Sequence, residues 1–179
     1  YAGALFDAQV DATLFDSADG TVKTFNNAGT LRKSAGTGTT TVYGTFNLGG
    51  TANVQTGTLN PIGAVTATAA GYSGAGRFLF TTGTLSGTQT VAAGANVELA
   101  SGTLLGTWTL AGTMNWTSGT LGAGGSTTIP AGSTLLVSST ADKDLRRTLD
   151  NSGTVLWTGG RLLGHSTPVI NNNAGAVFE

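Results

Sequence analysis

The chain has 179 residues, of which 29 are glycine and only 9 % are charged, and its formal net charge is -1. This balance provides no basic face of the kind that displaces counterions from nucleic acid, so no nucleic-acid partner is expected. The sequence has no cysteine, which excludes disulfides and thiolate metal sites. Hydrophobic residues still reach 39 %, more than a disordered glycine-rich linker contains, so we expect a folded protein.

Threonine, which is about as abundant as glycine, favours β-strands together with valine, while glycine marks turns, so the composition indicates an all-β protein. No apolar run approaches the ~18 residues of a membrane span, so no membrane insertion is expected. The chain starts at Tyr1 without a methionine, and we expect that a targeting segment has been removed. Abundant threonine and scarce lysine favour an extracellular or cell-surface location.

Residues 1–20 do not fit the repeat that follows them. They hold four carboxylates, the ligand type that calcium prefers, at Asp7, Asp11, Asp16 and Asp19. The spacing of these residues matches no EF-hand or other calcium loop. We therefore interpret the segment as a degenerate first coil or an N-terminal cap, with calcium binding as the weaker alternative.

Residues 21–179 repeat with a period of about 20 residues. Eight glycines that precede an alternating apolar pair anchor the repeat, namely Gly29, Gly50, Gly76, Gly94, Gly112, Gly132, Gly153 and Gly175. A second marker, Gly-Thr-Leu, starts at Gly57, Gly83, Gly102 and Gly119, with Gly160-Arg161-Leu162 as a variant. The two markers predict a parallel β-solenoid, a right-handed β-helix of about eight coils with three short strands each.

Stacking the coils at ~4.8 Å predicts three internal ladders, with every anchor glycine at the same corner. The first ladder contains Val22, Val42, Val91, Leu110, Ile129, Leu149 and Ile170. The second contains Leu85, Leu104, Leu121 and Leu162. The third contains Phe78/Phe80, Val97/Leu99, Met114/Trp116, Leu135/Val137 and Val155/Trp157. An antiparallel sandwich of hairpins is the alternative, but it does not explain the period near 20 residues.

Residues 142–147, Asp-Lys-Asp-Leu-Arg-Arg, form the one dense charged cluster. They stand where the Gly-Thr-Leu marker is missing, so we expect an exposed loop, or a short helix over residues 141–148. Replacing the insert with a Gly-Thr-Leu link should then leave the fold standing. The candidate exposed site consists of Asp142, Asp144, Arg146, Arg147 and Arg161. Two carboxylates ~5–9 Å apart can cleave glycosidic bonds, but residues two apart reach that separation only by accident of loop shape, so local ion pairs are the preferred interpretation.

The remaining candidate residues lack the partners that a catalytic or ligand-binding site needs. His165, the only histidine, lies in a Gly-His-Ser-Thr turn without partners for a metal. No Gly-x-Ser-x-Gly nucleophile motif is present, and no helix follows the glycine-rich run 71–76 to hold a phosphate. We therefore assign no catalytic, cofactor-binding or metal-binding residue, and we expect the chain not to be an enzyme.

Threonine pairs suit an ice-binding face if they recur at one position of the coil. The pairs considered, Thr37/Thr39/Thr41, Thr66/Thr68 and Thr107/Thr109, do not, so ice binding is disfavoured. Aromatic residues able to stack on sugars, such as Tyr43 and Tyr72, are few, whereas Trp108, Trp116 and Trp157 have the parity of core positions. Carbohydrate binding therefore remains an alternative function, as does a polysaccharide lyase or hydrolase.

The segments Phe25-Asn-Asn-Ala-Gly-Thr-Leu31, Asn151-Ser-Gly-Thr-Val155 and Asn172-Asn-Ala-Gly-Ala-Val177 carry a family resemblance. The chain resembles the β-helical repeat regions of large secreted bacterial surface proteins, of the autotransporter-passenger and filamentous-haemagglutinin-like type. The resemblance covers most of residues 20–179 and implies export and a structural or adhesive scaffold. It suggests surface glycans or other surface proteins as partners. The chain stops in mid-coil, so we expect a segment of a longer protein that could associate end to end or edge to edge.

Overall fold

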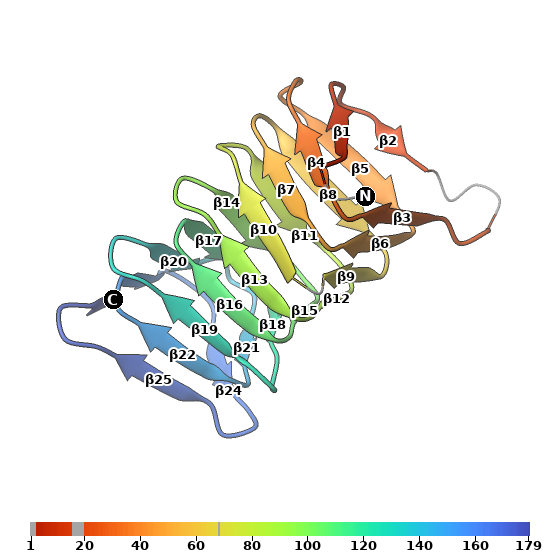
Figure 1. Ribbon diagram of the computed structural model, residues 1–179. Helices are drawn as coiled ribbons and strands as arrows, with labels where there is room; N and C mark the ends of the chain where they lie inside the picture. The colour runs from red at the N-terminus through yellow and green to blue at the C-terminus, as the bar shows by residue number, and fades with distance from the viewer. Residues whose placement is uncertain (1–2, 16–19, 68) are drawn as a thin grey trace.

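The computed structural model describes residues 3–15, 20–67 and 69–179, and in this part of the chain all regular structure is β. Every strand pairs in parallel with a strand one coil away, so the chain winds into a β-solenoid of about eight turns (Figure 1). No antiparallel hairpin occurs among the described strands. The described residues include no helix long and apolar enough to cross a membrane.

Three faces form the solenoid, and we name their sheets A to D. Sheet A contains β1 (Leu5–Ala8), β4 (Thr30–Lys33), β7 (Thr51–Val54), β10 (Ala69–Ser73), β13 (Thr88–Val91), β16 (Thr107–Leu110), β19 (Ser126–Ile129), β22 (Thr148–Asn151) and β25 (Val169–Asn172). Sheet B contains β2 (Thr13–Leu14), β5 (Thr39–Tyr43), β8 (Thr58–Ile62), β11 (Arg77–Phe80), β14 (Asn96–Leu99), β17 (Thr113–Trp116), β20 (Thr134–Val137), β23 (Thr154–Trp157) and β26 (Val177–Phe178).

The third face is divided between two shorter sheets. Sheet C contains β3 (Thr24–Asn27), β6 (Thr45–Leu48) and β9 (Val65–Ala67). Sheet D contains β12 (Thr84–Leu85), β15 (Thr103–Leu104), β18 (Gly119–Leu121), β21 (Lys143–Leu145) and β24 (Leu162–Gly164). The parallel solenoid predicted from the repeat is therefore confirmed.

The third predicted ladder is confirmed over its whole length in sheet B. Phe78 pairs with Val97, and the same register continues through Met114 and Leu135 to Val155. The second row of each strand forms another ladder. Its members are buried except for the last one, Trp157, which is 43 % exposed; they are Phe80, Leu99, Trp116, Val137 and Trp157. Alternate side chains of these strands point inward, so each coil buries its apolar pair against the pair of the next coil.

The first predicted ladder is only partly correct. Val91 pairs with Leu110 in sheet A, but Val42 lies in β5 of sheet B, and Val22 is 80 % exposed outside any strand. Ile129 pairs with Asn151 instead of Leu149. Each strand of sheet A has two inward positions, and a shift of two residues exchanges them without turning any side chain outward. The repeat therefore identifies the inward residues but not which of the two rows each one joins.

The second predicted ladder is confirmed for Leu85, Leu104 and Leu121, but its next member is Leu145, and Leu162 pairs with Lys143. The charged segment is thus a regular strand, β21, and the expected protruding loop or helix is wrong. Alternation explains the difference, because Lys143 and Leu145 point inward and the acidic residue between them points outward. Lys-Asp-Leu takes the place of Gly-Thr-Leu in this coil.

Six anchor glycines, from Gly76 onward, lie at the corner between sheets A and B. Gly29 and Gly50 instead lie between sheets C and A, so the expectation of one shared corner is wrong for these two. A Cβ atom on Gly50 would lie 2.0 Å from the carbonyl oxygen of Gly29, and one on Gly29 would lie 2.1 Å from that of Ala4. Close approach of successive coils requires glycine at this corner too, which is why the two corners look alike in the sequence.

The first coil is short but regular. β1 pairs with β4 and β2 pairs with β5, so residues 5–14 extend sheets A and B by one strand each. Residues 5–14 thus provide the first strands of sheets A and B, and the interpretation of residues 1–20 as a degenerate first coil or an N-terminal cap stays a prediction. Asp16 and Asp19 lie outside the described residues.

Aromatic side chains fill the middle of the core. Tyr72 stacks on Trp108 with ring centroids 5.8 Å apart, and it makes an edge contact with Phe78 at 4.9 Å. Its hydroxyl donates a hydrogen bond of 2.9 Å to the Gln89 side chain, and burial raises the pKa of Tyr72. Tyr72 is therefore a core residue and not a surface platform for sugars.

Truncation of Ile129, which is 0 % exposed, tests the core directly. We expect Ile129→Ala to lower the free energy of unfolding by about 2–5 kcal/mol, because it leaves a cavity between two coils. Thr128→Ala, on the outward side of the same strand, should change it by less than about 0.5 kcal/mol. Urea unfolding followed by circular dichroism measures both. Equal effects of the two substitutions would contradict the assignment of Ile129 to the interior.

Candidate functional site

The charged residues chosen from the sequence gather on the outer side of sheet D, at β21 and β24. Arg161 donates two hydrogen bonds to Asp142, from Nε to Oδ1 at 3.0 Å and from Nη2 to Oδ2 at 2.5 Å. The two residues come from adjacent coils, which the register of β21 with β24 places side by side. Four of the five candidate residues, all except Arg147, lie on this surface.

His165, which was interpreted as an isolated turn residue, completes the group. Its Nδ1 atom lies 2.8 Å from Oδ1 of Asp144, while Arg146 Nε donates to Oδ2 of Asp144 at 2.6 Å. The signal that could have found it is the spacing: His165 stands about one coil after Asp144, as Arg161 does after Asp142. We call Asp142, Asp144, Arg146, Arg161 and His165 the sheet D charge cluster.

Both carboxyls of the sheet D charge cluster are held in the ionised form. The hydrogen bond from Arg161 lowers the pKa of Asp142. Burial alone would raise the pKa of Asp144, but hydrogen bonds from Arg146 and His165 outweigh it, so this pKa is also lowered. Hydrolysis of a glycosidic bond by paired carboxyls uses one with a raised pKa as the general acid. Neither carboxyl here has that property.

A shallow groove of about 270 Å³ runs along sheet D beside the cluster. Its lining consists of Thr103, Leu105, Thr120, Gly122, Ala123, Arg146 and Ser166. The groove offers hydroxyls and one guanidinium, groups that suit hydrogen bonding to a sugar or an anion. These lining side chains supply no carboxylate or imidazole, so the groove itself is suited to binding and not to proton transfer.

Arg147, expected on the exposed surface, is buried with only 3 % exposure. Its guanidinium donates to the carbonyl oxygens of Leu104, Gly106 and Gly122, with distances of 2.8 Å to Gly106 and 2.7 Å to Gly122. Burial lowers the pKa of Arg147 to about 10, so the side chain stays charged at neutral pH. Arg147 points inward because it follows Leu145 by two residues, and it therefore does not belong to the exposed site.

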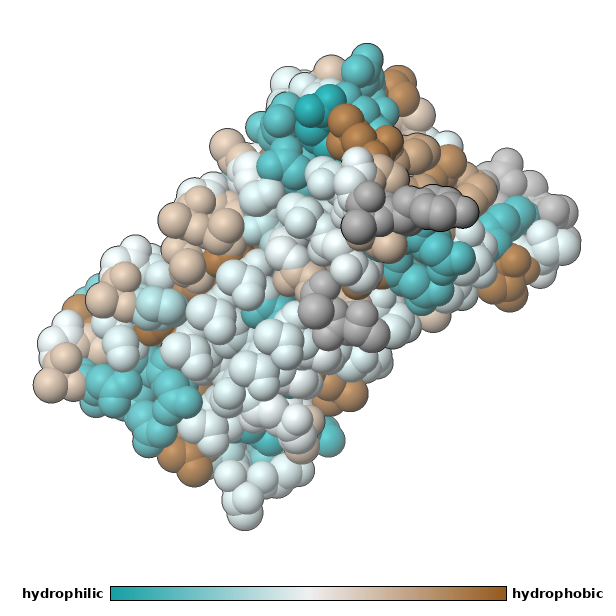
Figure 2. All heavy atoms as spheres, in the orientation of Figure 1, coloured by the Kyte–Doolittle hydropathy of each residue, from teal (hydrophilic) through white to brown (hydrophobic). Residues whose placement is uncertain are grey.

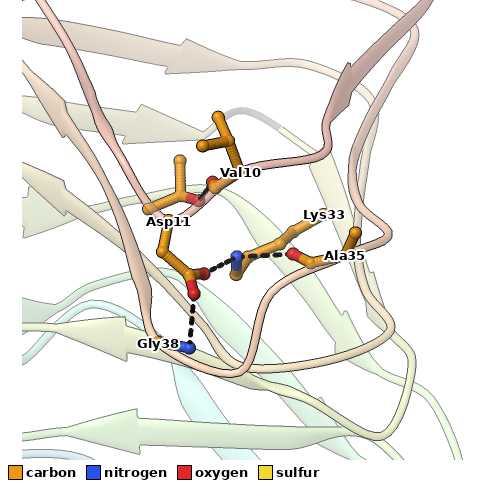
Figure 3. A network of polar contacts seen from close by, with 6 residues as sticks. Val10, Asp11, Lys33, Ala35 and Gly38 are labelled. Atoms are coloured by element: carbon orange, nitrogen blue, oxygen red, sulfur yellow. Dashed lines mark hydrogen bonds and ion pairs between the residues drawn. The ribbon is translucent and has the colours of Figure 1, made fainter.

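Two further cations are buried in the same manner. Lys143 donates to the carbonyl oxygens of Ser139, Ala141 and Gly159 at 2.8–3.0 Å, and burial lowers its pKa. Lys33 donates to Ala35 and to the Asp11 carboxylate (Figure 3). Lys33 lies at the corner between sheets A and B, Lys143 between B and D, and Arg147 between D and A. Within the described residues, each corner type thus has a buried cation that donates to at least one backbone carbonyl oxygen.

Of the N-terminal carboxylates considered for calcium, Asp7 and Asp11 lie in the described part of the chain, and both are bonded to other residues. Asp7 accepts a hydrogen bond from Arg32 at 2.6 Å. Asp11 accepts from Lys33 at 2.6 Å and from the Gly38 amide at 2.9 Å, and these contacts lower its pKa. Among residues 3–15, 20–67 and 69–179, no group of three or more His, Cys, Asp or Glu side chains is arranged to hold a metal ion.

A second surface was missed by the sequence reasoning: the outward side of sheet A. The register of β13, β16, β19 and β22 aligns hydroxyl side chains in two rows. We call this surface the threonine face, and it consists of Thr88, Thr107, Ser126 and Thr148 in one row and Thr90, Thr109 and Thr128 in the other. The threonine pairs considered in the sequence do not share one coil position, as expected, but the pair Thr88/Thr90, which was not considered, lies one coil before Thr107/Thr109 at the same position. The pairs that were considered come from different sheets, since Thr39 and Thr41 lie in β5 and Thr66 lies in β9.

Comparison of the chain with protein-family models, curated proteins and solved structures finds no match.

Comparison of the same substitution at Arg147 and at its exposed neighbour Arg146 tests the role of the buried cation. Arg147→Met should lower the free energy of unfolding by about 1–3 kcal/mol for each carbonyl left without a donor. Arg146→Met should have little effect, because its guanidinium is exposed and pairs only with Asp144. Urea unfolding of the two variants gives the comparison. Similar stabilities would contradict the buried position of Arg147. For the same reason, replacement of residues 142–147 by a Gly-Thr-Leu link should destabilise the fold, contrary to the expectation from the sequence.

The lowered pKa of Asp144 predicts a dependence on pH. A carboxyl whose pKa is lower in the folded than in the unfolded chain, where it is about 3.9, stabilises the fold above that pH. This contribution is lost as the pH falls through the folded-state pKa. Asp144→Asn should therefore destabilise the protein at pH 7, and the difference from the wild type should shrink in acid. Thr120→Val, one coil earlier at the same outward position, should have an effect that does not change with pH. Thermal unfolding between pH 7 and the acid range measures both.

Proposed function

We propose that the chain is a structural or adhesive scaffold segment, a stalk in a secreted or cell-surface protein. The observation that carries the proposal is the direction of its polar contacts, most of which link one coil to the next along the solenoid axis. Such a segment holds a functional tip away from a surface, or presents a long, nearly uncharged side to a partner.

Ion pairs and neutral pairs share this direction. Arg77 pairs with Glu98 at 2.7 Å and Arg32 with Asp7 at 2.6 Å, and each pair joins adjacent coils. Neutral side chains do the same in Asn26–Asn47, Asn53–Ser73, Asn60–Thr81 and Asn115–Ser138, and the Asp150 carboxylate accepts from Asn171 of the next coil. Together with the backbone ladders they resist separation of coils, and every added coil lengthens the stalk by ~4.8 Å.

Export and surface location belong to the same proposal. A chain without cysteine cannot form unwanted disulfides during export, and its few charges are largely neutralised by partners within the chain. The family resemblance of the Asn-Ala-Gly and Asn-Ser-Gly segments supports this role. Surface glycans are the second class of partner, favoured by the groove beside Arg146.

Removal of one complete coil tests the scaffold. Deleting residues 107–125 joins Gly106 to Ser126 and keeps a glycine before β19. The deletion brings like residues together, namely Val91 with Ile129, Val97 with Leu135 and Leu104 with Leu145. We expect a soluble, parallel β-solenoid that unfolds cooperatively and is shorter by about one strand spacing, ~4.8 Å, in small-angle scattering. Deleting only residues 107–116 breaks the register of the three sheets and should prevent folding. A chain that tolerates both deletions equally, or neither, would contradict the modular scaffold.

The enzymatic alternative has its own test. The scaffold proposal expects no cleavage of a panel of acidic and neutral polysaccharides, measured by reducing-end release and by the ultraviolet absorbance of unsaturated products. Cleavage that is abolished by Asp142→Ala or Asp144→Ala would overturn it, because these are the paired carboxyls of the sheet D charge cluster.

A further inference from the structure

The threonine face has a regularity that the stalk function does not require. In Figure 2 the side of the molecule over β13, β16 and β19 is pale, the colour of residues that are neither strongly hydrophilic nor hydrophobic. Thr90 pairs with Thr109, and Thr109 with Thr128, while Thr88 pairs with Thr107 in the parallel row. The second row continues beyond Gly71 to Thr51 and Thr30. The result is a neutral two-row grid over the three coils of β13, β16 and β19, and its first row continues into a fourth coil at Thr148.

The hydroxyls of the grid are free to bind an external partner. None of them takes part in a hydrogen bond within the part of the chain that the structure describes, and Thr88, Thr90 and Thr107 are exposed. Sheet B differs, because Arg77 interrupts its row of threonines and the row beside them holds Glu98 and the side chains of Leu136 and Leu156. Sheet D carries the charge cluster. The two-row hydroxyl pattern therefore belongs to sheet A.

The positions of these hydroxyls are fixed by the fold. Parallel strands set the distance between coils at ~4.8 Å and the distance between residues two apart at ~6.6 Å. Threonine is β-branched, so few rotamers are open to its side chain. Beneath the grid, Trp108 and Gln89 are fully buried, so the backbone that carries it rests on a packed core. Binding to a partner of matching repeat then costs little conformational entropy.

We propose that the threonine face binds ice. A crystal of water presents rows of oxygen atoms with a fixed repeat close to the spacing of adjacent β-strands, and each threonine offers it one hydroxyl and one methyl group. The hydroxyls enter the hydrogen-bond lattice, and the methyl groups lie in the gaps between oxygens. A two-dimensional rigid grid meets such a lattice at many points at once, so that individually weak contacts add.

The surroundings favour ice over a polysaccharide surface. Sugar rings stack on exposed aromatic faces, but the aromatic residue of this region, Trp108, points inward and is 0 % exposed. Charged side chains are also scarce, since Asp150 at the end of the second row is the one charge that β13, β16, β19 and β22 carry outward. A neutral surface of hydroxyls and methyls suits water in an ordered lattice.

Ice-affinity partitioning tests the proposal. The purified chain, mixed with a non-binding reference protein, is exposed to a slowly growing ice hemisphere, and the fraction taken into the ice is measured. We expect incorporation above that of the reference protein. Thr109→Lys, at the centre of the grid, should abolish it, because a long charged side chain holds the face away from the ice. Thr90→Lys, at a more exposed position, repeats the test if the first variant is unstable.

Thr134→Lys on sheet B is the matched control, with the same change on a half-buried outward threonine. It should leave incorporation unchanged, and circular dichroism should show that all variants are folded. Exclusion of the wild type from ice, or equal loss in the sheet B variant, would overturn the proposal. Retention of the wild type on insoluble cellulose or chitin together with exclusion from ice would also overturn it, and would assign the face to a polysaccharide. None of these outcomes bears on the coil deletions, so the scaffold proposal is tested separately.

Discussion

Each described strand of this protein pairs only with strands one coil before or after it, and no described strand pairs with its neighbour in the sequence. This constraint determines most of what the structure contains. Each position of a strand must accept the same position one coil later, so like side chains stack on like, and any side chain that points inward does so in a ladder. The corners must let two backbones pass within contact distance, which is why Gly29 and Gly50 have no room for a Cβ atom. Outward side chains repeat with the same spacing as the coils, so the seven hydroxyl residues of the threonine face lie in a regular grid.

Corners are the places where the pairing constraint is hardest to meet, because the carbonyls there turn away from the strand direction. Buried cations solve the problem at all three corner types. Arg147 and Lys143 each donate to several carbonyl oxygens, and Lys33 donates to the Ala35 carbonyl oxygen and the Asp11 carboxylate. Removing a charge from water is costly, and the cost is offset only when the surrounding acceptors are well placed. The three cations therefore act as internal braces. They also explain why a chain with so few charged residues places three of them in its interior.

Much of the fold could be predicted from the sequence, and the failures have a common cause. The ladder through Met114 and Leu135 was predictable because both of its rows are apolar in every coil. Leu149 and Ile170 were assigned to the row of Ile129, although they lie in the other inward row, because a shift of two residues leaves the pattern of inward and outward residues unchanged. Lys143 and Arg147 were expected on the surface because they are charged. Their spacing of two residues from Leu145, however, indicates inward positions when residues alternate along a strand. His165 and the threonine face were missed because each depends on residues about one coil apart, while the search looked at neighbours within a strand.

The aromatic cluster of Tyr72, Phe78 and Trp108 has a consequence for the way the chain acquires its structure. All strand pairings join residues about one coil apart, so every coil has the same short loop to close, and no distant pairing is needed to begin folding. We expect the first stable piece to form where the gain per coil is largest, and the stacked rings in the middle of the molecule provide such a gain. Strands are then added one at a time toward both termini, each using the previous coil as a template. Folding of this protein is thus a process of growth from its centre.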